Sequence, residues 1–383
     1  MTIRGRGRGL RSLWKWVPRP AAILKNHVLF RWIAPARTRP LRPRALCLYV
    51  TYRCNMRCRT CGIWKNNRQA LDSEMTLAEI DRILADPLFA KVEFVNLNGG
   101  EPVLRTDLAD IAALVLNRFR RIHTLTLNTN GFMPRRVREA VDRISRLCAV
   151  RRVKFSVAVS LHRPDDRFDE IAGVRGAYAK VMESLDVLSA LQTTHSFYLS
   201  VNCVATNLNL DALEEMVAWG RRKNIPVNFT LGERRARFDN LDAAGDIHPQ
   251  GIDRVRLAGF FRSLARYKSE YRQHALRYAE LAEMIEHDRE RSLACHYAIG
   301  GAIVGSDGAL FYCKNSPPLG NCRERAACEI YEDPKNLAFR AGGLFQGTCP
   351  HCPPNTMIKM EAEKDLGKVL AFLLRPGRKG GRR

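Results

Sequence analysis

Between residues 45 and 231 the chain alternates short apolar runs with longer amphipathic stretches. The apolar runs occupy residues 45–52, 91–97, 122–128, 153–161, 197–205 and 226–231. Runs of this length and composition are typical of strands that are buried on both faces. The pattern therefore predicts six core strands.

The amphipathic stretches occupy residues 76–86, 106–119, 134–147, 177–191 and 211–223. Thr76 and Glu79 form the sequence signature of a capping box at the start of the first stretch, which supports a helix there. Strands and helices that alternate in this way predict a parallel sheet with right-handed crossovers, either an open doubly wound sheet or a partial barrel of six units. In both folds a ligand binds at the C-terminal ends of the strands.

The flanks divide the chain further. Residues 1–44 form a basic arm, in which 21–33 are predicted to be an amphipathic helix that lies on a membrane surface or packs across the bottom of the main domain. The predicted core covers 45–235, a helical connection 236–292, a small cysteine-rich α+β domain 293–358, and a basic tail 359–383. In the cysteine-rich part, residues 302–313 are predicted to form a hairpin that turns at Ser306–Gly308.

The formal net charge is +24, and residues 1–44 contain no Asp or Glu. Because much of this excess lies in the two tails, the charge does not favour nucleic acid as a partner of the folded domains. The basic segment Gly232–Arg237, GERRAR, is interpreted as a solvated loop. No run approaches the roughly 20 apolar residues of a membrane-spanning helix, and no secretory signal is recognised, so a cytoplasmic protein with possible peripheral membrane contact is expected.

The cysteines are the residues that say most about the chemistry of this protein. Structural disulfides are not expected in the cytoplasm, so the 12 cysteines favour metal or cluster ligation. Cys54, Cys58 and Cys61 follow the first predicted strand directly. Three thiolates on one loop can bind three irons of a cubane and leave the fourth iron open. A zinc site is the alternative, although zinc usually takes four protein ligands.

At this CxxxCxxC loop the sequence resembles the radical S-adenosylmethionine (SAM) superfamily. The resemblance implies a partial (β/α)6 barrel, a [4Fe-4S] cluster on the three cysteines, and reductive cleavage of SAM to a 5′-deoxyadenosyl radical that abstracts hydrogen from a substrate. It also implies that the NGGEP element places Gly99, Gly100 and Glu101 at the methionyl ammonium. Further expected cofactor contacts, at the ends of later strands, are Thr129, Asn130, Ser160 and Asn202. Thr60 departs from the family, which often has an aromatic residue there.

A second group of six cysteines falls between residues 295 and 352. Four thiolates from separate loops would enclose a cluster completely. Cys295, Cys313, Cys349 and Cys352 resemble the start of a SPASM or twitch extension, which implies one auxiliary [4Fe-4S] cluster. Cys322 and Cys328 could replace one of the four, and a structural zinc is the alternative. Three other cysteines, Cys47, Cys148 and Cys203, are predicted to be buried small hydrophobes.

The main hypothesis is therefore a radical SAM enzyme that takes an electron from a donor such as flavodoxin or ferredoxin and acts on an unidentified organic substrate. A lipid, isoprenoid or sugar fits the amphipathic N-terminal arm, and a peptide remains open. The alternatives are a non-catalytic iron-sulfur or zinc protein that binds nucleic acid, and a radical SAM enzyme that modifies RNA or transfers a methyl group.

Overall fold

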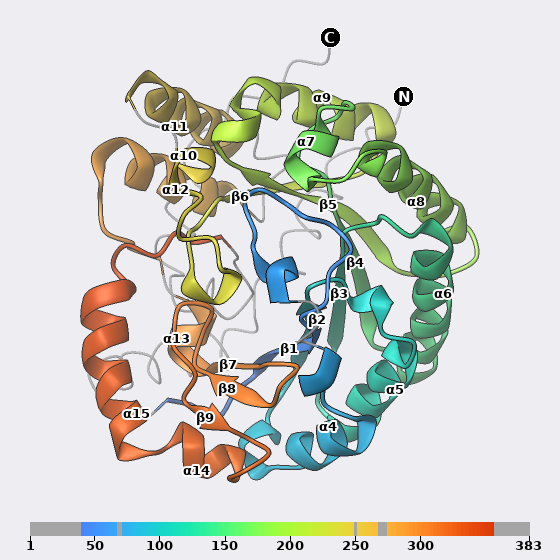
Figure 1. The fold of residues 1–383 in the computed structure, drawn as a ribbon, viewed down its shortest axis with the longest axis vertical. Coiled ribbons are helices and arrows are strands. Elements are labelled where there is room, and N and C mark those ends of the chain that lie inside the picture. Colours follow the sequence, from blue (N-terminus) through green and yellow to red (C-terminus); the bar gives the residue numbers. More distant parts are fainter. Residues whose placement is uncertain (1–39, 67–70, 249–250, 267–273, 294, 356–383) are drawn as a thin grey trace, which may run out of the picture.

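A computed structural model describes residues 40–66, 71–248, 251–266, 274–293 and 295–355. Its framework is a single sheet of nine strands in the order β6-β5-β4-β3-β2-β1-β7-β8-β9 (Figure 1). The first six strands are β1 Ala45–Thr51, β2 Phe94–Gly99, β3 Thr124–Thr129, β4 Lys154–Ser160, β5 Tyr198–Ala205 and β6 Val227–Leu231. Each is parallel to its neighbour. All six predicted strands are confirmed.

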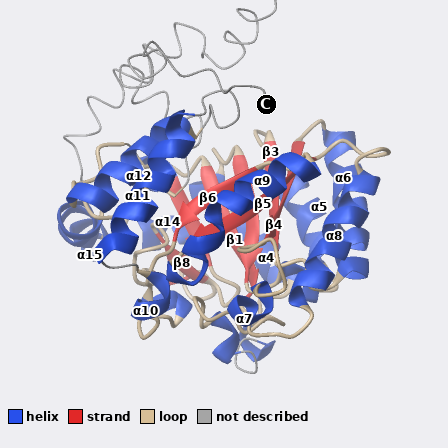
Figure 2. Cartoon of the chain, turned by 90° about the horizontal axis from the view of Figure 1, so that it is seen from above, coloured by secondary structure: helices blue, strands red, loops and turns tan. Residues whose placement is uncertain are grey.

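Five helices connect these strands and form an arc outside them (Figure 1). They are α4 Leu77–Leu84, α5 Leu108–Arg118, α6 Pro134–Arg151, α8 Ala177–Leu191 and α9 Leu213–Lys223. The predicted capping box is present, since Thr76 accepts from the Glu79 amide while the Glu79 carboxylate accepts from the Thr76 amide. Among the described residues, these helices cover only the outer face of the curved sheet, so the chain adopts the partial barrel and not the doubly wound sheet (Figures 1 and 2).

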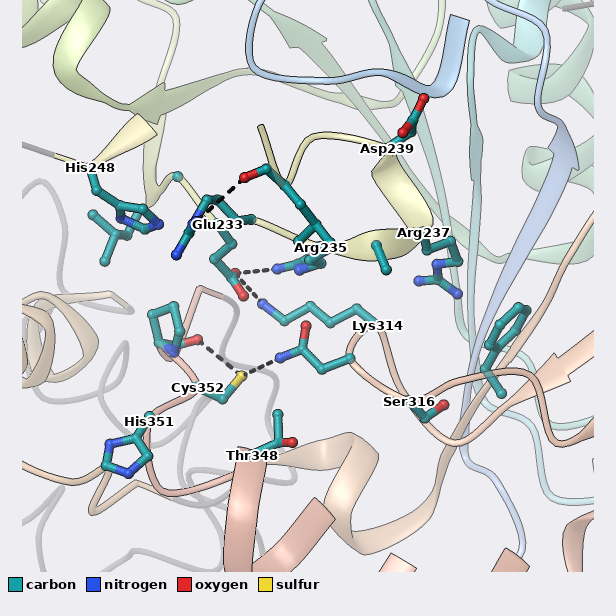
Figure 3. Close-up of a pocket in the computed structure, with 18 of the residues that line it drawn as sticks. Glu233, Arg235, Arg237, Asp239, His248, Lys314, Ser316, Thr348, His351 and Cys352 are labelled. Carbon is teal, nitrogen blue, oxygen red and sulfur yellow. Dashed lines mark hydrogen bonds and ion pairs between the residues drawn. The ribbon is translucent and has the colours of Figure 1, made fainter. Parts of the chain in front are cut away.

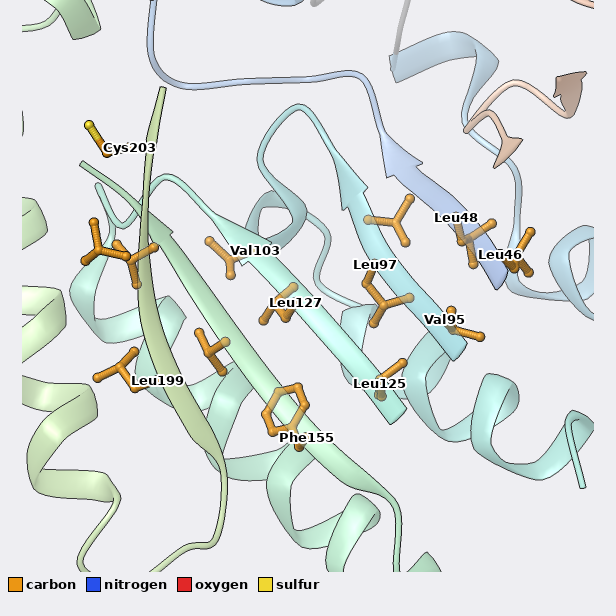
Figure 4. Packing of buried hydrophobic residues seen from close by; sticks show 14 of the residues in the cluster. Leu46, Leu48, Val95, Leu97, Val103, Leu125, Leu127, Phe155, Leu199 and Cys203 are labelled. Carbon is orange, nitrogen blue, oxygen red and sulfur yellow. The ribbon is translucent and has the colours of Figure 1, made fainter. Parts of the chain in front are cut away.

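The two faces of the strands differ in polarity. Val95 and Leu97 of β2 are fully buried on the helix side, with Leu125 and Leu127 of β3 beside them (Figure 4). The alternate positions of both strands are only half-buried, and they carry polar residues such as Asn96. The expectation that every strand is buried on both faces is therefore wrong for β2 and β3. Their inner face lines the barrel interior, and no second layer of helices from the described ranges covers it.

The chain beyond β6 returns to the same sheet. Two helices, α11 Gly251–Arg266 and α12 Ala275–His287, confirm the helical connection, and aromatic side chains join them to the barrel: Phe260 lies edge-on to Phe229 of β6, with ring centroids 5.0 Å apart. The strands β7 Gly301–Val304, β8 Ala309–Phe311 and β9 Gly320–Asn321 follow. β7 is parallel to β1, and β7 and β8 form the predicted antiparallel hairpin.

Short helices complete the described fold: α7 Phe168–Ala172, α10 Ala244–Ile247, α13 His296–Gly300, α14 Ala327–Tyr331 and α15 Pro334–Phe339. A π-helical segment, Arg340–Thr348, leads to the last cysteines. The predicted amphipathic helix at 21–33 and the basic tail at 359–383 lie outside the described residues. None of the helices in the described ranges has the length and apolar character needed to cross a membrane.

Candidate functional site

The loop that carries Cys54, Cys58 and Cys61 leaves the C-terminal end of β1, and all three cysteines are half-buried. Backbone hydrogen bonds fix the loop on the side of α7. The Arg57 amide donates to the Ala172 carbonyl at 2.9 Å, and the Arg59 amide donates to the Ile171 carbonyl at 3.0 Å. These bonds attach the first half of the loop to α7.

Glycines hold this loop on its other sides. The Gly100 amide donates to the Thr51 carbonyl at 2.8 Å, and the Glu101 amide donates to the Arg53 carbonyl at 2.7 Å. A Cβ atom on Gly100 would lie 2.1 Å from the Arg53 carbonyl oxygen, so only glycine fits. Gly62 makes an equally close approach to the carbonyl of Asp239. The close backbone packing explains why the element after β2 begins with Gly-Gly.

The Glu101 side chain is fully buried and joins β2 to β3. Its carboxylate accepts from the Thr129 hydroxyl at 2.7 Å, the Asn130 amide at 2.5 Å and the Val103 amide at 3.2 Å. Burial raises the pKa of this carboxyl to about 7 despite these bonds. A contact between Glu101 and a ligand ammonium remains a prediction. In this structure the carboxylate links the end of β2 to the end of β3.

The other expected cofactor residues gather at the same edge of the sheet. The Asn130 side-chain amide lies 3.7 Å from the Cys54 sulfur and donates to the Asn55 side-chain oxygen at 2.8 Å. Ser160 and Asn202 are register partners at the end of β4 and in β5, and both are half-buried. The structure thus brings the predicted residues of β2 to β5 to the side of the barrel that carries the cysteine loop.

Burial disfavours the ionised form of the cysteine thiols. It raises the pKa of Cys54 to about 11 and also raises the pKa values of Cys58 and Cys61. Thiolates at these positions need a compensating positive charge, which a bound metal centre supplies. Among the described residues, no three His, Cys, Asp or Glu side chains converge on a single metal ion. Cysteines that bind different irons of a cubane need not converge on one point, so the donor set fits a cluster.

The four cysteines expected to form a second site are also brought together. Cys295 precedes α13, Cys313 follows β8, and Cys349 and Cys352 follow the π-helical segment. Burial, together with the neighbouring Cys295, Cys313 and Cys352, raises the pKa of Cys349 to about 12. The Asn315 side chain donates to the Cys352 sulfur at 3.2 Å.

Cys322 and Cys328 lie elsewhere. Burial raises the pKa of each thiol most, and the nearby Asp86 carboxylate raises it as well. The Cys328 amide donates to that carboxylate at 3.1 Å. Asp86 caps a short helix next to α4, so these two cysteines belong to the packing of α14 against the barrel. The alternative in which one of them replaces a member of the four is not supported.

Other candidates from the sequence prove structural. Cys47, Cys148 and Cys203 are buried, as predicted. His162, directly after β4, is half-buried and accepts from the Val204 amide at 3.3 Å, and burial lowers its pKa to about 4. Arg175 is exposed just before α8.

A cavity of about 1400 Å³ opens between the end of β6, helices α11 and α12, and the cysteine-rich segment (Figure 3). Tyr52 and Ile63, at the two ends of the cysteine loop, lie on one side, and Cys352 lies on another. GERRAR forms a wall of this cavity: Arg234 and Ala236 are exposed, as the interpretation as a solvated loop expects, whereas Glu233, Arg235 and Arg237 are partly buried. The position of this segment directly after β6, at the edge where parallel strands bind ligands, was the signal that could have revealed it.

Comparison with known proteins gives this geometry its context. The family profile of the radical SAM superfamily matches residues 48–220, which span β1 to α9. This part of the chain is a radical SAM domain. The matched residues include the cysteine loop, Gly99–Glu101, Thr129, Asn130, Ser160 and Asn202.

Curated relatives and solved structures agree with this assignment. The chain is 33% identical over 189 residues to GTP 3′,8-cyclase of Acidothermus cellulolyticus and 29% identical over 204 residues to GTP 3′,8-cyclase 3 of Mycobacterium tuberculosis. These matches cover 48% and 50% of this chain and 49% and 50% of the relatives, so the chain spans about half the length of the curated relatives it matches. Streptococcus suis SuiB, solved with its precursor peptide SuiA, has a TM-score of 0.56 at 16% identity over 85% of this chain and 73% of SuiB, which shows a shared fold.

Radical SAM proteins use a [4Fe-4S] cluster and SAM. Cys54, Cys58 and Cys61 lie within the matched residues, so their thiols are the candidates for holding such a cluster. The cysteine-rich segment lies beside β1 in the same sheet. Its Cys352 lines the cavity together with Tyr52 and Ile63, which lie next to the two ends of the barrel cysteine loop.

Proposed function

We propose that this protein is a radical SAM enzyme that generates a 5′-deoxyadenosyl radical at the barrel mouth and abstracts hydrogen from an organic substrate in the adjoining cavity. The observation that carries the proposal is the CxxxCxxC loop fixed at the C-terminal ends of six parallel strands, within residues that match the superfamily. When bound, the cluster and SAM supply an electron and a C5′–S bond whose reductive cleavage gives the radical and methionine.

The chain's own residues would hold and orient these groups. Cys54, Cys58 and Cys61 ligate three irons and leave one for SAM. The Gly99–Gly100 backbone, supported by Glu101, faces the methionyl group, while residues at the ends of β3, β4 and β5 contact the rest of the cofactor. Cys295, Cys313, Cys349 and Cys352 hold an auxiliary cluster on the far side of the cavity. Because Cys352 lines the cavity, a cluster held by these residues would be able to contact the substrate or exchange an electron with it.

The substrate is selected by residues outside the family match. The match ends at residue 220, whereas most of the cavity wall lies between Leu231 and Pro353. The named activity of the relatives makes GTP a useful comparison substrate, but the residues that would select it lie largely beyond the matched region. The flavodoxin or ferredoxin donor and the peripheral membrane contact are likewise proposals that rest on the sequence.

The test is reductive SAM cleavage by protein reconstituted without oxygen. With dithionite, the wild-type protein should convert SAM to 5′-deoxyadenosine and methionine, measured by liquid chromatography with mass spectrometry. Replacing Cys54, Cys58 and Cys61 by alanine should abolish the product. The matched control is Cys148→Ala, which removes a buried thiol from α6 and should retain the activity. Absence of 5′-deoxyadenosine from wild-type protein with an intact barrel cluster would refute the proposal and favour a non-catalytic role.

A further inference from the structure

Most charged side chains around the cavity have partners of opposite charge. The pairs are Glu233 with Arg235 and Lys314, Asp239 with Lys65, and Asp288 with Arg254. The first group contains one carboxylate and two cations. Glu233 is almost fully buried, and the two neighbouring cations hold its pKa below the ordinary value, so this group leaves one positive charge in excess.

Arg237 differs from these residues because no described acidic side chain forms an ion pair with it. Its guanidinium lies over the rings of Tyr49 and Phe311, at 4.8 and 4.6 Å from their centroids. One nitrogen, Nη2, donates to the Tyr49 hydroxyl at 3.3 Å, while Nε and Nη1 are buried without a hydrogen-bond partner among the described residues. Leaving buried donors unsatisfied is costly, so the structure retains an uncompensated cation at the cavity wall.

The placement of Arg237 connects the cavity to the barrel. Tyr49 belongs to β1, five residues before Cys54, and Phe311 belongs to β8, two residues before Cys313. Arg237 therefore contacts both strands that lead into the cysteine sites, β1 before Cys54 and β8 before Cys313. The residues expected to contact SAM lie instead at the ends of β2 to β5, so this guanidinium is not part of that group.

The cavity also has an apolar part. Leu257 of α11 and Met284 and Ile285 of α12 line it, next to the ion pair of Arg254 and Asp288 from the same helices. A ligand with an anionic group and an apolar or neutral body matches this lining, because planar guanidinium groups recognise carboxylate and phosphate oxygens particularly well. Ordinary ligand pockets of about 300–1,000 Å³ hold drug-sized molecules, so the space here is ample.

We propose that the cavity binds an organic anion and that Arg237 receives its carboxylate or phosphate oxygen. This inference rests on the proposed function, which it deepens by giving the substrate's chemical class. The excess charge of the Glu233, Arg235 and Lys314 group adds a second, longer-range attraction for the same anion.

Binding can be measured without turnover. The probes are sodium pyrophosphate and sodium succinate, titrated by calorimetry into the anaerobically reconstituted full chain at constant ionic strength. The variants are Arg237→Gln, which removes the charge, and Arg237→Lys, which keeps it. The matched control is Arg135→Gln on the outer surface of α6, which changes the net charge of the protein equally. Reductive SAM cleavage is measured for each protein in parallel.

We expect at least one probe to bind the wild-type protein saturably, and the stronger probe identifies the anion as phosphate or carboxylate. Arg237→Gln should weaken this binding by about 10- to 100-fold, the effect of losing one charged hydrogen bond, while Arg237→Lys keeps part of it. Arg135→Gln should leave binding unchanged.

Two results would overturn the assignment. One is no saturable binding of either probe up to about 10 mM, the range of a weak site. The other is loss of SAM binding and cleavage in Arg237→Gln, which would assign the guanidinium to the cofactor. If instead wild-type protein binds the probe but never cleaves SAM, the proposed function fails and the anion site stands.

Discussion

Gly173 offers a direct test of how the cysteine loop is held. This residue ends α7 with a left-handed φ of +64°, and a Cβ atom on it would lie 2.2 Å from the Arg57 carbonyl oxygen. The obstacle is backbone of the cysteine loop itself, between Cys54 and Cys58, so it cannot move aside as a flexible side chain would. Gly173→Ala should therefore displace the loop on which the three thiolates depend.

Gly176 is a matched control three residues away. Its φ is +77°, and a Cβ atom there would meet nothing within 4 Å. Gly176→Ala should lower the free energy of unfolding only by the left-handed backbone penalty of about 1–2 kcal/mol. Gly173→Ala should lower it by a similar amount and by a further contribution of about 1–3 kcal/mol from overpacking against the Arg57 carbonyl. The difference between the two variants isolates the contact with the loop.

The assay is iron and sulfide content per chain after anaerobic reconstitution, together with the free energy of unfolding of the metal-free protein. Gly173→Ala should be the less stable variant and should lose most of the iron of the barrel cluster. Gly176→Ala should keep that iron. Equal iron content in the two variants would refute the reasoning, because it would mean that the close approach of Gly173 does not determine the position of the loop.

Three further predictions follow from the same geometry. Cys295→Ala should lower the iron content from about eight to about four per chain, as expected for loss of one [4Fe-4S] cluster, while Cys322→Ala should leave it unchanged; equal losses would place Cys322 in the cluster site. Asn240→Ala should lower the free energy of unfolding by about 2–4 kcal/mol in urea titrations, because its buried amide bridges the carbonyls of Thr60 and Glu233 at 2.8 and 3.1 Å; a change under about 0.5 kcal/mol would contradict this. Since burial raises the pKa of Glu101 to about 7 from 4.5, the folded protein holds this proton more tightly than the unfolded chain, and stability should fall by about 3 kcal/mol as pH rises from about 4.5 to about 7. Metal-free Glu101→Gln should lack this component, and identical pH profiles for variant and wild type would exclude it.

The barrel could be predicted from sequence because its signals are local. The spacing of apolar residues predicts each strand and helix, and the capping box of Thr76 and Glu79 lies within four consecutive positions. Local spacing could not distinguish a partial barrel from an open sheet. That choice depends on which face of each strand is covered by helices, and the half-buried Asn96 and Asn128, which share a hydrogen bond of 3.3 Å, show the uncovered face only after folding.

The cysteines illustrate both the power and the limit of spacing. The loop from Cys54 to Cys61 is continuous, so the sequence displays the whole ligand set. The second set combines Cys295, Cys313 and the pair near residue 350, and it could be separated from Cys322 and Cys328 only through three-dimensional contacts. Asp86, more than 200 residues away in sequence, is the neighbour that assigns those two cysteines to a different place.

GERRAR shows why a charge run is a weak guide to exposure. Arg235 and Arg237 lie at the cavity wall because Glu233 binds Arg235 and Lys314, and because aromatic rings from β1 and β8 accept the Arg237 guanidinium. Lys314 comes from the segment after β8, which reaches this place only because β7 pairs with β1. Cys352 of the same segment also lines the cavity. A single long-range strand pairing therefore places residues of the barrel and of the cysteine-rich segment around one cavity, which is where the proposed substrate would contact both.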